Sequence, residues 1–345
     1  MPIEHETRDG ALVWIRNPIT GVISYVVDLR NKSFAFTLGM RDEPIEPPHL
    51  TDEQIRAATK DCPFCPGNER LCTAELFRLT AQDIPDWTGR DKRNGDEWVV
   101  RVFNNLFPRI PSELTGGRNE SYIVVEDPRH YVDSPRSHSD LLSTGMLGEG
   151  HFRCLLEADV RVMRLARENH SVRAVVIRKN QGRESGASQP HPHQQILGSP
   201  EPFPAVAAEA RAERETPGLF DEIVTLMERL GLTIENDKGV VSYASPIGAF
   251  PRSYDVVMPQ HRDATLADLS ADELGRFAGA IYRVLRILGP LPLDYEIHQG
   301  PGVPLHAHLN ARFFPYSNVA GTLNLPSTLL ERTAEIRNAI ARRRG

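Results

Sequence analysis

The feature that most constrains the fold is a pair of His-x-His segments, one in each half of the chain. His191-Pro192-His193 follows a helical pattern over about 149–170, a strand and a glycine-bearing loop. His306-Ala307-His308 follows a helical pattern over about 270–288, a strand and a Gly/Pro loop. Because the same order of elements occurs twice, the sequence indicates an internal duplication. We therefore expect a chain of mixed strands and helices with two similar halves.

Pattern and composition divide the chain into three consecutive regions. Residues 1–60 are patchy and rich in proline, which predicts an N-terminal extension with a short strand or two and then an irregular connector. Residues 61–200 hold the first half and residues 201–345 the second. In the second half, Ser270 and Glu273 have the spacing of a capping box, which predicts that a helix starts there.

Composition excludes several classes of protein. The 345 residues are 40% hydrophobic and 25% charged, which is ordinary for a globular chain. A formal net charge of −6 argues against broad attraction to nucleic acid, so an anionic ligand needs local binding groups. The start lacks the pattern of a secretory leader, no apolar run reaches the length of a membrane span, and four cysteines are too few for a disulfide scaffold. We expect a cytoplasmic protein without nucleic-acid or membrane partners.

The first His-x-His segment has the features of a phosphate-handling site. Alternate side chains of a strand share a face, so His191, His193 and Gln195 are expected to point the same way, about 7 Å apart. Pro192 cannot donate a ladder hydrogen bond, which places it at a sheet edge or among the first residues of a strand. The preceding loop, 180–188, contains two glycines whose amides can approach a phosphate closely. The alternative is a structural pair of histidines on a polar strand face.

Cys62-Pro63-Phe64-Cys65 allows three interpretations. A redox pair of the glutaredoxin kind should open a helix, but Pro66-Gly67 follows at once. A disulfide is disfavoured by the expected compartment. The third interpretation is half of a tetrahedral zinc site, completed by ligands from elsewhere in the chain, for which His130 and His191 are the candidates.

Three further histidines converge in the second half. His306 and His308 share a strand face, and His298 ends the strand before them. Three imidazoles on adjacent strands suit a transition metal, usually completed by a carboxylate. The alternative is a polar cluster on a sheet edge.

Taken together, these segments resemble the galactose-1-phosphate uridylyltransferase family, a branch of the histidine-triad superfamily. The segment 188–195, Ser-Gln-Pro-His-Pro-His-Gln-Gln, is similar to the family signature Ser-Asn-Pro-His-Pro-His-Gly-Gln. Further collinear similarities lie at Asn-Pro-Ile-Thr-Gly (17–21), at the Cys-x-x-Cys segment, at Val-Phe-Asn-Asn-Leu-Phe-Pro (102–108), and at Asp-Pro-Arg-His (127–130). The resemblance covers most of residues 10–315. It implies an α+β fold of two fused histidine-triad motifs that form a mainly antiparallel sheet flanked by helices, in a protein that is commonly a homodimer.

The resemblance also implies roles for individual residues. His193 would be the nucleophile, Gln195 and Ser188 would bind the transferred phosphoryl group, and Asn105 and Asn180 would lie near the nucleotide and its phosphates. A structural zinc would be bound by four residues: Cys62, Cys65, His130 and His191. A second divalent metal, iron or zinc, would be bound in some members by residues that match Glu209, His298, His306 and His308 here.

The implied reaction moves a nucleoside monophosphate, with UMP expected, between sugar 1-phosphates through a covalent nucleotidyl-histidine. Two alternatives remain open: a nucleoside-diphosphate-sugar phosphorylase that uses inorganic phosphate, and an inactive zinc-stabilised nucleotide-binding protein. Family enzymes for hexose phosphates carry a glutamate and then a glutamine after the His-x-His strand. This chain has no Asp or Glu between His308 and Glu331. The sequence therefore predicts that galactose 1-phosphate is not the preferred acceptor.

Overall fold

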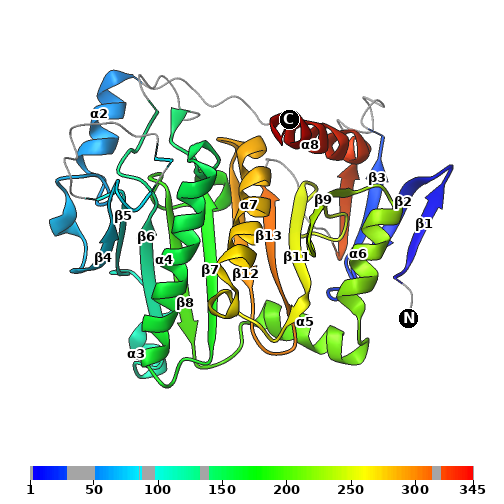
Figure 1. The fold of residues 1–345 in the computed structure, drawn as a ribbon, viewed down its shortest axis with the longest axis horizontal. Helices are drawn as coiled ribbons and strands as arrows, with labels where there is room; N and C mark the ends of the chain where they lie inside the picture. The colour runs from blue at the N-terminus through cyan, green and yellow to red at the C-terminus, as the bar shows by residue number, and fades with distance from the viewer. Residues whose placement is uncertain are drawn as a thin grey trace. The chain divides into compact units, whose positions relative to one another are not determined.

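The computed structural model describes residues 3–28, 51–84, 86–87, 98–132, 140–312 and 320–344. The chain forms two compact units. The first comprises residues 1–45, 204–268 and 293–345, and the second comprises residues 46–203 and 269–292. Figure 1 labels the elements along the chain. The three consecutive regions expected from the sequence stay a prediction.

Among its described residues, the second unit has five antiparallel strands in the order β4-β5-β6-β8-β7. Their bounds are β4 (Glu75–Leu79), β5 (Val100–Asn104), β6 (Glu120–Val125), β7 (Ala174–Gln181) and β8 (His193–Ser199). The helices of this unit are α2 (Asp52–Lys60), α3 (Ser112–Thr115), α4 (Glu149–Glu168) and α7 (Ala271–Leu288), with short 3-10 turns η1 (Glu69–Leu71), η4 (Thr144–Met146) and η5 (Arg183–Ser185).

Helix α4 covers one face of these strands (Figure 1). Its apolar residues recur at the spacing predicted from the sequence, and they are all buried: Phe152, Leu155, Leu156, Val160 and Met163. Helix α7 packs against α4, and the predicted capping box at its start is present, because Ser270 accepts from the backbone of Glu273. The Tyr282 hydroxyl on α7 donates to the Leu147 carbonyl, which further ties α7 to the segment that leads into α4.

The opposite face of the same strands carries the cysteine-containing turn. Cys62, Phe64 and Cys65 form a buried cluster with apolar residues of β5 and β6, among them Phe103 and Ile123. This packing buries the turn on the β5–β6 side of the face. β8, which begins at His193, lies on the other side of β6.

The first unit contains a second set of five antiparallel strands and a small sheet. The larger set has the order β12-β13-β11-β10-β9, and the small sheet the order β1-β2-β3-β14. The bounds are β1 (His5–Arg8), β2 (Ala11–Arg16), β3 (Ile23–Val27), β9 (Thr233–Asp237), β10 (Val240–Ala244), β11 (Ser253–Arg262), β12 (Leu293–His298), β13 (Pro304–Ala311) and β14 (Thr322–Pro326). The helices are α5 (Pro204–Glu215), α6 (Leu219–Arg229) and α8 (Leu329–Arg344), with the turn η6 (Leu266–Asp268).

The predicted fold class is confirmed, because the structure is α+β with mainly antiparallel sheets. The N-terminal region departs in detail from the expectation. It has three strands where one or two were expected, and α2 lies where an irregular connector was expected. Helix α2 has its own capping box at Thr51 and Gln54, a local signal that favours a helix start at this position. The connector within residues 29–50, and residues 313–319 of the segment after the second His-x-His, lie outside the described residues.

Candidate functional site

His193 is the first residue of β8 and is held in one tautomer. The strand begins after Pro192 and lies between β6 and β7, so Pro192 precedes an interior strand and does not mark a sheet edge. The side chain of His193 is 5% exposed, and its Nδ1 lies 2.8 Å from the carbonyl oxygen of His191. Because a carbonyl only accepts, Nδ1 carries the proton and Nε2 keeps its lone pair. The nitrogen that can act as a nucleophile is therefore Nε2.

The surroundings of His193 keep its imidazole neutral. Burial, and then the nearby positive charge of Lys179, lower the pKa of His193 to about 4. The ring of Phe64 packs edge-on against the imidazole, with 5.0 Å between ring centroids. A neutral imidazole at neutral pH has the protonation state that nucleophilic attack requires.

The sheet register gathers polar residues beside His193. Gln195 is two residues along β8 on the same face, and its partner across the ladder is Arg178 of β7. Arg178 donates to Oδ1 of Asn180, with 2.7 Å between the atoms. Asn180 in turn donates to the Ser185 carbonyl, and so joins the strand to the glycine-containing loop. Ser188 is exposed in the chain segment between that loop and His193.

Asn105 lies further from the nucleophile. It follows β5, where its side chain contacts Ser121 and the backbone of Phe107. The register pairs His193 with Val125 and Val125 with Arg101, and Asn105 is four residues beyond Arg101. At about 3.3 Å per residue this is about 13 Å along the strands, a distance suited to the nucleoside end of a nucleotide.

A buried ion pair supports the strand from its helix-covered side and was not found from the sequence. Lys179 Nζ lies 2.7 Å from Oε1 of Glu126 and 3.3 Å from the carbonyl oxygen of His193. Thr144 donates to the other carboxylate oxygen of Glu126, at 2.7 Å. The only signal in the sequence was a charged pair, Arg178-Lys179, at the end of an otherwise apolar strand. The Lys179–Glu126 ion pair holds the backbone of His193 in place, because Lys179 also contacts the His193 carbonyl oxygen.

Cys62, Cys65, His130 and His191 form the first candidate metal centre. Their donor atoms all lie within 4.8 Å of one another, and all four side chains are buried. Cys65 Sγ is 3.4 Å from His130 Nδ1 and 3.5 Å from His191 Nδ1. In a tetrahedral zinc site with ordinary bond lengths, a sulfur and a nitrogen ligand are about 3.5 Å apart. The donor set and its spacing therefore fit zinc.

The chemistry of the cluster agrees with its geometry. The four cysteines of the chain are free thiols, so Cys62 and Cys65 do not form a disulfide. The pKa of the Cys62 thiol is lowered, because the Cys65 thiol and then the two imidazoles stabilise its thiolate against the cost of burial. His191 Nε2 lies 2.7 Å from the Asp127 carbonyl oxygen, which leaves Nδ1 free to bind a metal. The pair lies in a turn rather than at the start of an α-helix, which argues against the redox interpretation.

Glu209, His298, His306 and His308 form the second candidate metal centre. Glu209 on α5 lies 2.8 Å from His298 Nδ1, 3.4 Å from His306 Nε2 and 3.2 Å from His308 Nε2. The two histidines of β13 sit on an interior strand between β12 and β11, so the alternative of a cluster on a sheet edge is wrong. Three imidazoles and one carboxylate suit iron or zinc.

Outer contacts orient these histidines. Asp255 Oδ1 lies 2.6 Å from His308 Nδ1, and the Pro304 carbonyl lies 2.7 Å from His306 Nδ1. Burial by itself would raise the pKa of Glu209, but His306 and His298 outweigh burial and hold the pKa well below its usual range. Glu209 is thus an anion before any metal arrives, as a metal-binding carboxylate must be.

We expect His306→Ala to lower the metal content of the second centre without preventing nucleotide labelling at His193. His306 is fully buried and supplies one of the four donor atoms, so its loss leaves an incomplete ligand set. Elemental analysis of the purified variant measures the loss, with the exposed His170→Ala as the matched control. Unchanged metal content in His306→Ala would show that the cluster is a hydrogen-bonded group of side chains.

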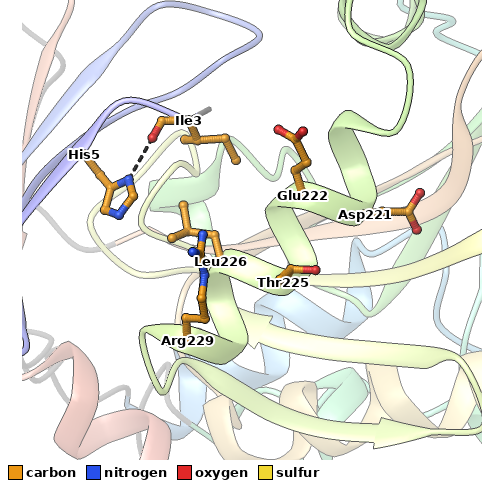
Figure 2. A pocket seen from close by; sticks show the side chains of 7 residues that line it. All are labelled: Ile3, His5, Asp221, Glu222, Thr225, Leu226 and Arg229. Carbon is orange, nitrogen blue, oxygen red and sulfur yellow. Dashed lines mark hydrogen bonds between the residues drawn. The ribbon is translucent and has the colours of Figure 1, made fainter. Parts of the chain in front are cut away.

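A pocket of about 550 Å³ lies elsewhere, in the first unit (Figure 2). It is lined by Ile3, His5, Asp221, Glu222, Thr225, Leu226 and Arg229. Asp221 forms an ion pair with Arg262, while His5 Nδ1 lies 2.7 Å from the Ile3 carbonyl oxygen. Two carboxylates in its lining make this pocket unsuited to an anionic nucleotide.

Comparison with known proteins finds similar sequences and similar structures. Residues 105–255 match the family model "Domain of unknown function (DUF4921)". An ADP-glucose phosphorylase of Arabidopsis thaliana is 26% identical over 70% of this chain and 67% of its own length. A galactose-1-phosphate uridylyltransferase of Hypocrea jecorina is 25% identical over 74% of each chain. The crystal structure of the Arabidopsis thaliana ADP-glucose phosphorylase with bound ADP-glucose superposes with a TM-score of 0.65 at 19% identity, covering 94% of this chain and 97% of the other.

The structural comparison shows that the chain has the fold of the uridylyltransferase-like proteins. The resemblance predicted from the sequence is confirmed: the chain is similar in sequence and in fold to galactose-1-phosphate uridylyltransferase-like proteins. Among the described residues, no helix is long and apolar enough to cross a membrane.

Proposed function

We propose that this protein is a nucleotidyltransferase that carries a nucleoside monophosphate on Nε2 of His193. The observation that carries the proposal is the hydrogen bond from His193 Nδ1 to the His191 carbonyl, because it leaves a neutral ring with its lone pair on Nε2. Its partners would be a nucleotide sugar and a sugar 1-phosphate, and the homodimer and the cytoplasmic location stay predictions. An inactive nucleotide-binding protein would not need to retain this arrangement.

The reaction has two halves. In the first, Nε2 of His193 attacks the α-phosphorus of a nucleotide sugar, a P–N bond forms, and the P–O bond to the sugar 1-phosphate breaks. In the second, an oxygen of the acceptor phosphate attacks the same phosphorus and the P–N bond breaks. Gln195 and the amides of the loop around Gly182 and Gly186 would donate to the phosphoryl oxygens in both halves.

The first metal centre would have a structural role. Zinc held by the two cysteines and by His130 and His191 would fix the backbone immediately before His193, because His191 supplies the carbonyl that orients the nucleophile. When bound, the metal supplies folding energy and places no charge on the transferred group.

A second candidate function, phosphorolysis of a nucleotide sugar by inorganic phosphate, is favoured by two observations. The Arabidopsis thaliana relative is named an ADP-glucose phosphorylase. In addition, this chain has no acid between His308 and Glu331 to accept hydrogen bonds from sugar hydroxyls. The two functions use the same first half-reaction and differ only in the acceptor.

A labelling experiment tests the shared first half. Purified protein is incubated separately with UDP-glucose, UDP-galactose and ADP-glucose, and its intact mass is measured. A mass increase by UMP or AMP, with release of one sugar 1-phosphate for each label, identifies the nucleotide. If none of the nucleotide sugars labels the protein, nucleotidyl transfer is not its function.

We expect galactose 1-phosphate to be a poor acceptor. In competition on the labelled enzyme, inorganic phosphate or a deoxysugar phosphate should remove the nucleotide at least about tenfold faster, because a site without the acid gains little from sugar hydroxyls. Glucose 1-phosphate is the matched comparison, since it differs from galactose 1-phosphate only at C4. Fastest discharge by galactose 1-phosphate would mean that the missing acid does not affect acceptor choice.

A further inference from the structure

We propose that Arg178 binds the phosphate group that leaves or enters at His193, namely the β-phosphate of a nucleotide sugar or the acceptor phosphate. This inference rests on the function proposed above and adds a residue to it. Arg178 lies near the end of β7, with a half-buried side chain.

The register of the sheet places Arg178 on the face of the nucleophile. Arg178 is the cross-strand partner of Gln195, and His193 is two residues from Gln195 on the same face. In an antiparallel ladder, directly opposed Cβ atoms are about 5 Å apart and diagonal neighbours about 7 to 8 Å apart. A long arginine side chain spans that distance, so its guanidinium can reach a phosphate next to the α-phosphorus on Nε2.

The contacts of Arg178 hold it at the phosphate loop. One of its N–H groups donates to Asn180 Oδ1 at 2.7 Å, and Asn180 also donates to the Ser185 carbonyl in the loop. A guanidinium has five N–H donors in a planar fork, a geometry that matches phosphate oxygens. The bond to Asn180 orients the guanidinium.

The positive charge of Arg178 explains why an arginine would be needed next to His193. Both half-reactions bring phosphate oxyanions together at one place, in a protein whose formal net charge is −6. The other cation at this position, Lys179, is buried on the helix-covered side in an ion pair with Glu126. Arg178 thus places a positive charge on the same face as His193 and Gln195, one strand from the nucleophile. Arg101 is on that face too, but it lies two strands away on β5 and forms an ion pair with Glu69.

The test compares the binding of nucleoside diphosphates and monophosphates. In the His193→Asn protein, which cannot form the adduct, calorimetry gives the Kd of UDP, UMP, ADP and AMP. Arg178→Gln in that background should weaken diphosphate binding by about 10- to 100-fold and change monophosphate binding by less than about twofold. Arg178→Lys should recover part of the loss, because the charge is kept. Arg173→Gln, an exposed change on the same segment, is the matched control and should leave both unchanged.

Two outcomes would overturn the assignment. If Arg178→Gln weakens monophosphates and diphosphates equally, the side chain supports the fold of the site and not the departing phosphate. If the parent shows no preference for the diphosphate, there is no phosphate site for Arg178 to form. If the His193→Asn protein prefers diphosphates but no nucleotide sugar labels the wild-type protein, the proposed reaction is contradicted and the assignment of Arg178 stands.

A second experiment distinguishes inorganic phosphate from a sugar 1-phosphate as the source of the bound phosphate group. In otherwise wild-type protein labelled with nucleotide, Arg178→Gln should raise the KM of the acceptor for discharge by about 10- to 100-fold, with the saturating rate little changed. The same increase for inorganic phosphate and for glucose 1-phosphate means that the phosphate group itself is bound. A fall in the saturating rate with an unchanged KM would show that Arg178 acts on His193 and would contradict the proposal.

Discussion

Replacing His193 by alanine should lower turnover of a nucleotide sugar by about 10⁴- to 10⁶-fold, the range found when an enzyme loses its covalent nucleophile. The reason is that both halves of the proposed reaction pass through a P–N bond at Nε2 of His193, which alanine cannot form. Rates of sugar 1-phosphate release by the wild type and the variant, at equal protein concentration, measure the effect.

His193 is buried, so its removal could also loosen the site, and a second variant separates the two effects. His193→Asn keeps an N–H near the position of Nδ1 and can still donate to the His191 carbonyl, but it has no counterpart of Nε2. It should have a Tm close to that of the wild type and be as inactive as the alanine variant. Activity of His193→Asn within about tenfold of the wild type would exclude His193 as the nucleophile.

Loss of the first metal centre should have the largest effect on stability. We expect zinc near one per chain in the wild type, and Cys62→Ser should lower both the zinc content and the Tm. Structural zinc contributes its binding energy to folding. If several kcal/mol of that energy is lost, a unit of this size should melt about 10 °C lower. Elemental analysis and thermal unfolding measure the two quantities.

Cys72→Ser is the matched control for this experiment. Cys72 is a half-buried thiol close to the same turn, with its Sγ 3.1 Å from the Pro63 carbonyl, but it is not one of the four clustered ligands. The Cys72→Ser variant should keep the zinc content of the wild type. Full zinc occupancy in a Cys62→Ser, Cys65→Ser double variant would place the metal elsewhere.

The candidate metal ligands and the candidate nucleophile could be predicted from the sequence, because their residue types occur at characteristic spacings. Cys-x-x-Cys and His-x-His spacings point to shared ligands and shared strand faces, and the structure brings Cys62 and Cys65 together with His130 and His191. Helices α4 and α7 were predictable for a different reason, because their apolar periodicity and the Ser270 capping box are local signals.

Features that depend on the pairing of strands could not be predicted. The sequence does not show that Arg178 lies opposite Gln195, or that Lys179 meets Glu126 behind His193, because both depend on register across distant segments. The interior position of β8 and β13 was missed for the same reason. The sequence likewise does not show that the His191 carbonyl accepts from His193 and fixes its tautomer.

The most direct test of the central claim is peptide mass spectrometry of the labelled protein, with the stability of the label measured in acid and in alkali. A nucleotidyl group on Nε2 of His193 forms a P–N bond, which should survive alkali and break in mild acid, unlike an ester to serine. We expect one nucleoside monophosphate on the peptide containing His193, labile to acid and absent from His193→Ala. An acid-stable label, or a label that persists in His193→Ala, would contradict it.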